Sequence, residues 1–103
     1  MVERLNQLRT YTINRGAMET FAKEWQVTIK PLREKLGFKV PAAWTIKESN
    51  QFVWLLSLED GGAWDALDRA YHDSDERREM QPDPARHIAR MESYFVEPVE
   101  INP

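Results

Sequence analysis

The two histidines, His72 and His87, are the side chains of this sequence best suited to act as a base near neutral pH. His72 follows Tyr71 in a segment of helical periodicity and lies about 100° around the helix axis from it. It therefore lies at the rim of the buried stripe, which fits the edge of a pocket and fits a solvent-exposed side chain equally well. Neither histidine is accompanied by a cysteine or forms a His-x-x-x-His pair, so a zinc site is not expected.

A second candidate group joins one cation with aromatic side chains: Arg9, Tyr11, Trp44 and Trp54. Aromatic walls around a fixed cation suit a planar or acidic organic ligand. Packing in a core or an interface is the alternative explanation for the aromatic residues. Arg9 is the sharper signal, because a charge in the middle of a strand must reach solvent, a ligand or an ion-pair partner such as Glu92. Together with His72, these residues are the candidates for a ligand pocket, and no catalytic residue is assigned.

Other functional motifs have little support in the sequence. The acidic stretch with Asp73, Asp75, Glu76 and Glu79 lacks the Asp-x-Asp-x-Asp-Gly loop of a calcium site. Helix capping by Asp73 and Glu76 explains this stretch more simply. The sequence contains no P-loop, no Gly-x-Gly-x-x-Gly and no Gly-x-Ser-x-Gly. We therefore expect neither nucleotide binding nor serine hydrolysis, and no cofactor.

Length and composition are those of one globular domain over residues 1–103. Hydrophobic residues make up 42% of the chain and charged residues 30%, which is ordinary for a soluble protein. The net charge of −3 argues against nucleic acid or an anionic membrane as a partner. The sequence has no signal-peptide pattern and no apolar stretch long enough for a membrane span, so a cytoplasmic protein is the default expectation.

The spacing of hydrophobic residues predicts the strands and helices that position the candidate pocket residues, beginning with the first half of the chain. Leu5–Ile13 is a predicted strand rich in β-branched and aromatic residues. A helix follows, because seven side chains recur at steps of three and four and fall within an arc of about 100°. These are Met18, Phe21, Trp25, Thr28, Ile29, Leu32 and Leu36. Gly37 is its predicted C-terminal cap, and Pro31 predicts a bend in the helix rather than its end.

The second half predicts two more strands, a helix and a last strand. Val40–Lys47 and Gln51–Leu58 flank a short polar connection that suits a hairpin. A second helix has an inner stripe of Trp64, Leu67, Ala70 and Tyr71. Asp73 with Glu76 predicts a capping box, and Asp83-Pro84 predicts another helical start. Ile88–Val96 has both helical spacing and strong β-propensity, and we interpret it as a strand. The order β-α-β-β-α-β predicts a ferredoxin-like α+β fold with both helices on one face of a four-stranded antiparallel sheet.

Apolar side chains on both surfaces of the strands predict a homodimer. The third strand carries Phe52, Trp54 and Leu56 on one parity and Val53 and Leu55 on the other. An antiparallel sheet with one wet face should instead alternate apolar with polar residues. Covering apolar surface is worth roughly 25 cal/mol per Å², and a second copy of the sheet is the obvious cover in so short a chain. Tolerated surface aromatics are the alternative.

The sequence resembles the NIPSNAP family over roughly Leu5 to Pro98. The run from Leu8 to Ile13 (LRTYTI) with Gly16 is similar to the opening of these domains, and the run from Ser93 to Pro98 (SYFVEP) is similar to their last strand. The resemblance implies a dimeric α+β barrel in which two ferredoxin-like sheets close face to face. Arg15 departs from the proline usual before the glycine, and the acidic turn after Asp73 lacks a tryptophan that the family often has.

Three functions remain open at the level of sequence. The resemblance implies an uncharacterised dimer, and we expect it to bind a small apolar or aromatic ligand in the barrel cavity. The broader superfamily includes cofactor-free monooxygenases and isomerases, which makes a small enzyme using His72 the alternative. An RNA-recognition module shares this strand order, but the third strand lacks the Lys/Arg-Gly-aromatic opening and the chain is acidic.

Overall fold

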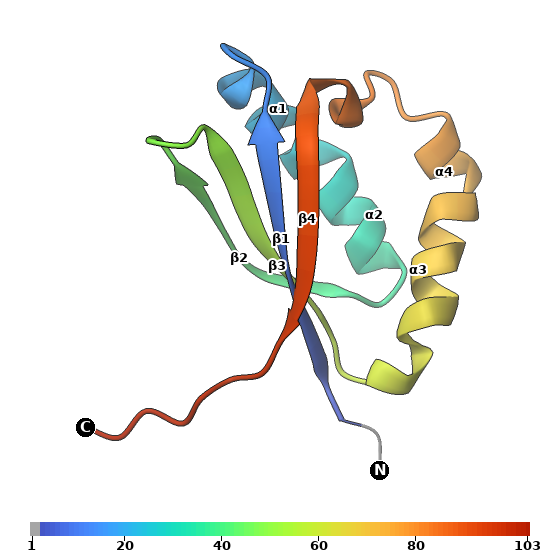
Figure 1. Cartoon of the computed structure of the whole chain (residues 1–103). Coiled ribbons are helices and arrows are strands. Elements are labelled where there is room, and N and C mark those ends of the chain that lie inside the picture. Colours follow the sequence, from blue (N-terminus) through green and yellow to red (C-terminus); the bar gives the residue numbers. More distant parts are fainter. Residues whose placement is uncertain (1–2) are drawn as a thin grey trace.

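The computed structural model describes residues 3–103, whose strands form one antiparallel sheet in the order β2-β3-β1-β4 (Figure 1). The strands are β1 (Leu5–Ile13), β2 (Lys39–Ile46), β3 (Gln51–Leu58) and β4 (Ile88–Val96). The central pair, β1 and β3, is flanked by β4 and β2, as a ferredoxin-like fold requires. The predicted fold class is therefore confirmed, and so is the interpretation of Ile88–Val96 as a strand.

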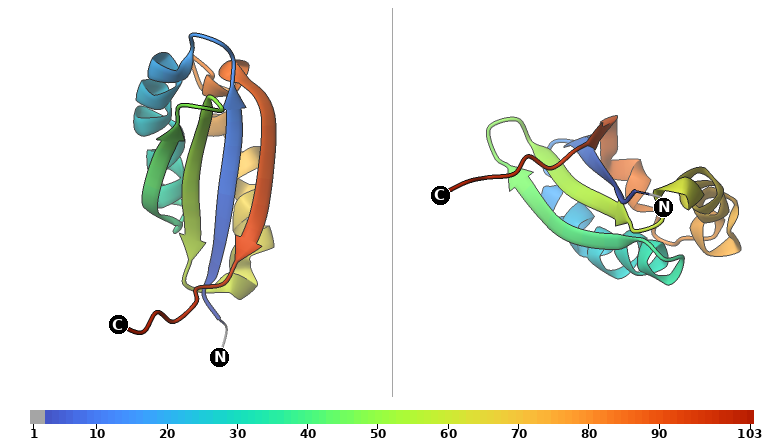
Figure 2. Two further views of the ribbon diagram at one scale, coloured as in Figure 1. Left: turned by 60° about the vertical axis from the view of Figure 1, so that its left-hand side comes forward. Right: turned by 90° about the horizontal axis from the view of Figure 1, so that it is seen from below.

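The helices lie together on one face of this sheet (Figure 2). They are α1 (Met18–Val27), α2 (Ile29–Lys35), α3 (Trp64–Asp73) and α4 (Asp75–Arg78), with short 3₁₀ turns at η1 (Gly61–Ala63) and η2 (Pro84–His87). Among the described residues, no helix combines the length and the hydrophobicity that crossing a bilayer requires.

The long helix predicted before the hairpin is interrupted, which corrects the expectation of a mere bend at Pro31. The chain leaves helical geometry at Thr28, with φ −122° and ψ −68°, and α2 then starts at Ile29. Pro31 cannot donate a hydrogen bond to the residue four positions earlier, and its ring clashes with that carbonyl. The break therefore falls one turn before the proline, which sits in the first turn of α2, where its missing N–H does no harm.

Two of the three predicted helix caps are confirmed, and the third is shifted by one residue. Gly37 has φ +106° and follows α2, while Phe38 N donates to Arg33 O over 3.1 Å. Asp83 Oδ1 accepts from Ala85 N over 3.0 Å, with the proline next to it at the first position of η2. The capping box predicted at Asp73 is wrong, because that residue still belongs to α3.

Ser74 caps α4 in place of Asp73. Its Oγ accepts from Arg77 N over 3.1 Å, and its own backbone is extended at ψ 147°. A serine with non-helical geometry whose oxygen meets the third amide of the following helix is the usual N-cap arrangement.

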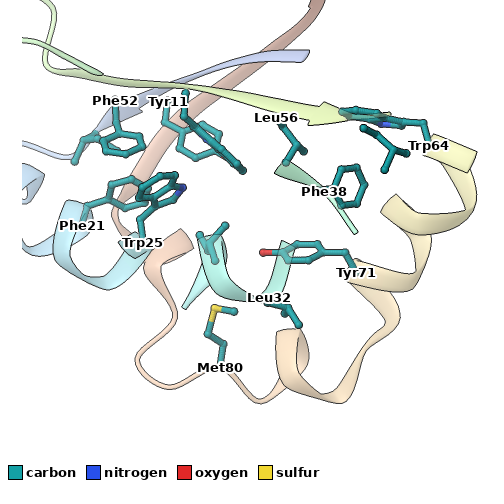
Figure 3. Close-up of a cluster of buried hydrophobic side chains, with 14 residues drawn as sticks. Tyr11, Phe21, Trp25, Leu32, Phe38, Phe52, Leu56, Trp64, Tyr71 and Met80 are labelled. Carbon is teal, nitrogen blue, oxygen red and sulfur yellow. The ribbon is translucent and has the colours of Figure 1, made fainter. Parts of the chain in front are cut away.

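The core lies between the sheet and the helices and is largely aromatic (Figure 3). Cross-strand neighbours in register share a face, and the pairs Tyr11–Phe52 and Arg9–Trp54 both point toward the helices. Phe21 packs edge-on against Tyr11 at 5.9 Å and against Phe52 at 5.1 Å between ring centroids. Such edge-to-face contacts add to area burial, so this side of the sheet is the well-packed one.

The helices leave the other face of the sheet open (Figure 2), and several exposed apolar side chains lie on it. Leu8 lies opposite Leu55 on β3 and opposite Tyr94 on β4, which places all three on this open face. Trp44 and Tyr94 are each 52% exposed there. This agrees with the two-sided apolar pattern of the sequence, and the second copy that would cover the face stays a prediction.

Candidate functional site

A cavity of about 60 Å³ lies between the sheet and helices α2 and α3. Arg9 and Tyr11 reach it from β1, and Trp54 reaches it from the neighbouring position on β3. His72 closes it from α3. The structure thus brings four of the five predicted pocket residues together. Larger hollows occur at the surface, such as one of about 480 Å³ beside Pro31 and Glu79, but they are open grooves away from these residues.

Trp44, the fifth predicted residue, lies on the opposite side of the sheet. It pairs in register with Val53, whereas Trp54 is the next residue along β3 and therefore points the other way. Trp44 is 52% exposed on the open face. No single cavity can contain Trp44 together with Arg9 and Trp54, because strand alternation separates them.

Arg33 on α2 is the most deeply buried charge of the cavity wall, with 1% of its side chain exposed. Its Nη1 donates to Asp68 Oδ1 over 2.8 Å, and its guanidinium carbon lies 3.6 Å from the ring centroid of Tyr71. Burial lowers the pKa of Arg33, and the hydrogen bond to Asp68 opposes that shift. Arg33 is not among the site residues predicted from the sequence; it follows Ile29 by four residues and lies about 40° from it around the helix axis, just outside the apolar arc. A charge in that position was the available signal.

Arg9 contacts neutral acceptors and not the predicted partner Glu92. Its Nη1 donates to Gln7 Oε1 over 2.7 Å, its Nε donates to Tyr11 Oη over 3.0 Å, and its Nη2 lies 3.4 Å from Met91 Sδ. Glu92 is wrong as a partner, because it pairs in register with Thr10 and therefore lies on the open face. No ion pair within residues 3–103 includes Arg9.

His72 stands at the mouth of the cavity, with 57% of its side chain exposed. Its Nε2 lies 3.7 Å from Asp68 Oδ1, which is longer than a hydrogen bond. Desolvation lowers the pKa of His72 below its ordinary value of 6.5, which favours the neutral imidazole at pH 7. Burial raises the pKa of Tyr71, which therefore keeps its phenolic proton. Figure 3 shows the Tyr71 hydroxyl reaching from α3 into the space beneath the sheet.

Buried N–H groups without a partner point to an incomplete site. Arg33 Nε and Trp54 Nε1 are buried in the protein and have no hydrogen-bond acceptor, and both residues line the cavity. A buried donor left unpaired costs about 1–3 kcal/mol, so native proteins nearly always satisfy it. Trp25 Nε1 and His87 Nε2 are also buried without a partner, but their residues do not line the cavity, so the unpaired donors support a ligand here only together with the charges of the lining.

His87 belongs to a separate cluster of charges. Arg86 binds Glu24 through both Nη atoms, each at 2.7 Å from a carboxylate oxygen, and His87 Nε2 lies 3.6 Å from Glu24 Oε1. The Arg86 guanidinium holds the pKa of Glu24 below its ordinary value. This arrangement joins η2 to α1 and shares no residue with the cavity lining. Within residues 3–103, no group of three His, Asp or Glu is placed to hold a metal ion.

The sequence profile of the NIPSNAP family matches residues 6–103. The chain belongs to the NIPSNAP family. An uncharacterized NIPSNAP domain protein from Burkholderia xenovorans has a similar structure, with a TM-score of 0.81 at 21% identity, covering 96% of this chain and 98% of that one. A NIPSNAP family protein from Agrobacterium tumefaciens gives 0.84 at 10% identity, covering 99% of this chain and 91% of its own. No curated protein matches the sequence.

The fold also extends beyond the NIPSNAP proteins. A protein provisionally described as an antibiotic biosynthesis monooxygenase, from Nitrosomonas europaea, has a TM-score of 0.69 at 8% identity and covers 96% of this chain and 93% of its own. At these identities the likeness shows the fold alone. The similar NIPSNAP structures are of proteins whose function is unknown, so the family membership brings no reaction with it.

Proposed function

We propose that this NIPSNAP protein binds a small organic molecule in the cavity between the sheet and helices α2 and α3. The observation that carries the proposal is a cavity whose lining includes Arg33 and Trp54, each with a buried side-chain N–H that has no acceptor. Aromatic rings of Tyr11 and Tyr71 supply apolar walls beside them, as ligand sites usually combine a few polar groups with an apolar lining. The site thus lies under the helices and not between two sheets.

The indole N–H signals of the tryptophans provide a direct test by ¹H–¹⁵N NMR. Trp54 lines the cavity, whereas Trp44 lies on the open face and serves as an internal control. A ligand that enters the cavity should move the Trp54 signal and leave the Trp44 signal in place, with the signals assigned from Trp→Phe variants. A panel of small aromatic compounds that shifts Trp44 alone would place binding on the open face and refute the proposal.

A small cofactor-free enzyme, a monooxygenase or isomerase, is the second candidate. The observation that favours it is a neutral imidazole, His72, at the mouth of a cavity whose lining also includes the guanidinium groups of Arg9 and Arg33, which could stabilise an oxyanion. The likeness of fold to the Nitrosomonas protein supports the same direction. Turnover of a panel of quinols by the wild type that is lost in His72→Ala would support it. Absent turnover, or turnover unchanged in His72→Ala, removes this candidate.

We also propose that two copies pair through the open face of the sheet. Support comes from Trp44, Ile46, Tyr94 and Val96, which are apolar and between 36% and 52% exposed on that face. Sedimentation at micromolar concentration should give twice the chain mass of 12.1 kDa, and Trp44→Glu should return it to one. A wild-type protein that sediments as a monomer would contradict this proposal.

A cytoplasmic location and the absence of nucleic-acid or membrane partners are likewise proposals. The net charge of −3 and the composition of an ordinary globular domain support them. Cell fractionation that recovers the protein with the membranes would contradict the location. Salt-dependent retardation of labelled single-stranded RNA would contradict the exclusion of nucleic acid.

A further inference from the structure

We infer that the cavity takes the head of a small monoanion, a carboxylate or a similar planar oxyanion, held between Arg9 and Arg33. This inference rests on the proposed function and names the class of ligand that the same site accepts. It follows from the balance of charge, the unused donors and the size of the cavity, each of which restricts the ligand independently.

The charges around the cavity do not balance. Three guanidinium groups line it, and two of them have a carboxylate: Arg33 has Asp68 at 2.8 Å and Arg77 has Asp83 at 3.3 Å. Arg9 has none, although it is half-buried. A cation that is partly removed from water and offered neutral acceptors is poorly compensated. The charge of Arg9 also opposes the ionised form of Arg33. One added negative charge would relieve both effects.

The donors left over match a planar oxyanion. Arg9 uses Nε and Nη1 on oxygen acceptors, while its Nη2 faces a thioether sulfur, which accepts weakly. Arg33 leaves Nε without any acceptor. Guanidinium groups bind carboxylates through N–H donors arranged in a plane, and these charge-assisted bonds are stronger than neutral ones. Arg9 Nη2, on the exposed side of the site, is therefore the donor most readily offered to a carboxylate, with the Arg33 guanidinium as the second cation nearby.

The cavity size restricts the rest of the ligand. A volume of about 60 Å³ admits a group the size of a carboxylate, whereas sites that enclose whole drug-sized ligands have roughly 300 Å³ or more. The remainder must leave through the mouth, where Met91 is 54% exposed and His72 has 57% of its side chain exposed. The rest of the ligand would then be a flat apolar group that lies on the side chains of Met91 and His72 at the mouth. The single unmatched cation favours a monoanion over a phosphate dianion.

Benzoate and benzamide form the decisive pair of probes, because they share shape and differ in charge. We expect benzoate to shift the Trp54 indole signal with a dissociation constant at least about tenfold lower than that of benzamide. Sodium chloride at matched ionic strength is the salt control. Arg9→Gln should remove the preference for benzoate, and Arg15→Gln, an exposed arginine of the turn after β1, should retain it.

Each outcome of this titration decides something. If benzamide shifts Trp54 as well as benzoate does, the cavity binds ligands and the inference of an anion is wrong. If neither probe shifts Trp54, the anion site and the proposed function fail together. A tenfold preference that survives in Arg9→Gln would exclude Arg9 from the site. Should Arg9→Gln fail to fold, the comparison of the two probes on the wild type still decides between a charged and a neutral ligand.

Discussion

Asp68→Asn tests how Arg33, the most deeply buried charge within residues 3–103, is held. Arg33 is 1% exposed, and its carboxylate partner Asp68 is 35% exposed. Removing one member of a buried ion pair costs about 3–5 kcal/mol, because the other charge remains behind without compensation. Water reaches the exposed part of Asp68 and reduces this penalty, so we expect a loss of about 2 kcal/mol in the free energy of unfolding.

Arg33→Met separates stability from binding at the same position. Replacing a buried ionic group by an apolar residue of similar volume is often neutral or stabilising. Asp68 is exposed enough to be solvated alone, so we expect Arg33→Met to lie within about 1 kcal/mol of the wild type. The same variant should lose the preference for benzoate over benzamide. Arg33 would then be a residue that serves the ligand and contributes little to folding.

Urea unfolding followed by tryptophan fluorescence measures these differences. All variants should be compared at one protein concentration, because self-association would make the midpoint depend on it. A loss of about 2 kcal/mol lowers the melting temperature of a chain this long by about 10 °C. Asp73→Asn, the same change at an exposed position of α3, is the matched control and should stay within about 0.5 kcal/mol. The reasoning is refuted if Asp68→Asn is no less stable than this control, or if Arg33→Met is less stable than Asp68→Asn.

Three further predictions concern the caps and the ion pair that fix the helices. Ser74→Ala should lower the free energy of unfolding in urea by about 1 kcal/mol. Asp73→Ala should change it by less than about 0.5 kcal/mol. If Asp73→Ala were the more destabilising of the two, Asp73 rather than Ser74 would be the cap. Gly37→Ala should lose about 1 kcal/mol, because φ is +106° there, and an unchanged midpoint would contradict that geometry. Glu24 has its pKa lowered by Arg86, so its contribution is present above the ordinary value of 4.5 and lost as pH falls through the lower value of the folded state. The stability gap between wild type and Glu24→Gln should therefore be open at pH 7 and close in acid, and a gap independent of pH would refute the pairing.

The architecture could be predicted from the sequence because its signals are local. The β-branched and aromatic residues of β1 predicted a strand over Leu5–Ile13, with the same bounds as the structure. Gly37 and Asp83-Pro84 mark their helix ends through backbone preferences that need no tertiary context. The break at Thr28 was not predicted, since Pro31 allowed either a bend or a restart and the choice depends on how both halves pack against the sheet.

The site could be predicted only in part. The types of its residues are visible in the sequence, but which of them meet depends on how the strands pair. Arg9, Tyr11 and Trp54 share a face, and this follows from the pairing of β1 with β3, which the sequence does not state. Trp44 was wrongly assigned to the same group, because the sequence does not show which residues of β2 share a face with Trp54. The register between β2 and β3 decides this, and that register shifts between Lys39 and Ala42. Arg33 was overlooked because its partner Asp68 is distant in sequence and meets it in the folded chain.

Crystals grown with 4-bromobenzoate test the central claim most directly, since the anomalous signal of bromine locates the ligand without assumptions. The account predicts bromine at the mouth beside His72 and Met91, with the carboxylate at Arg9 and Arg33. Bromine on the open face beside Trp44, or a cavity left empty at saturating ligand, would contradict it.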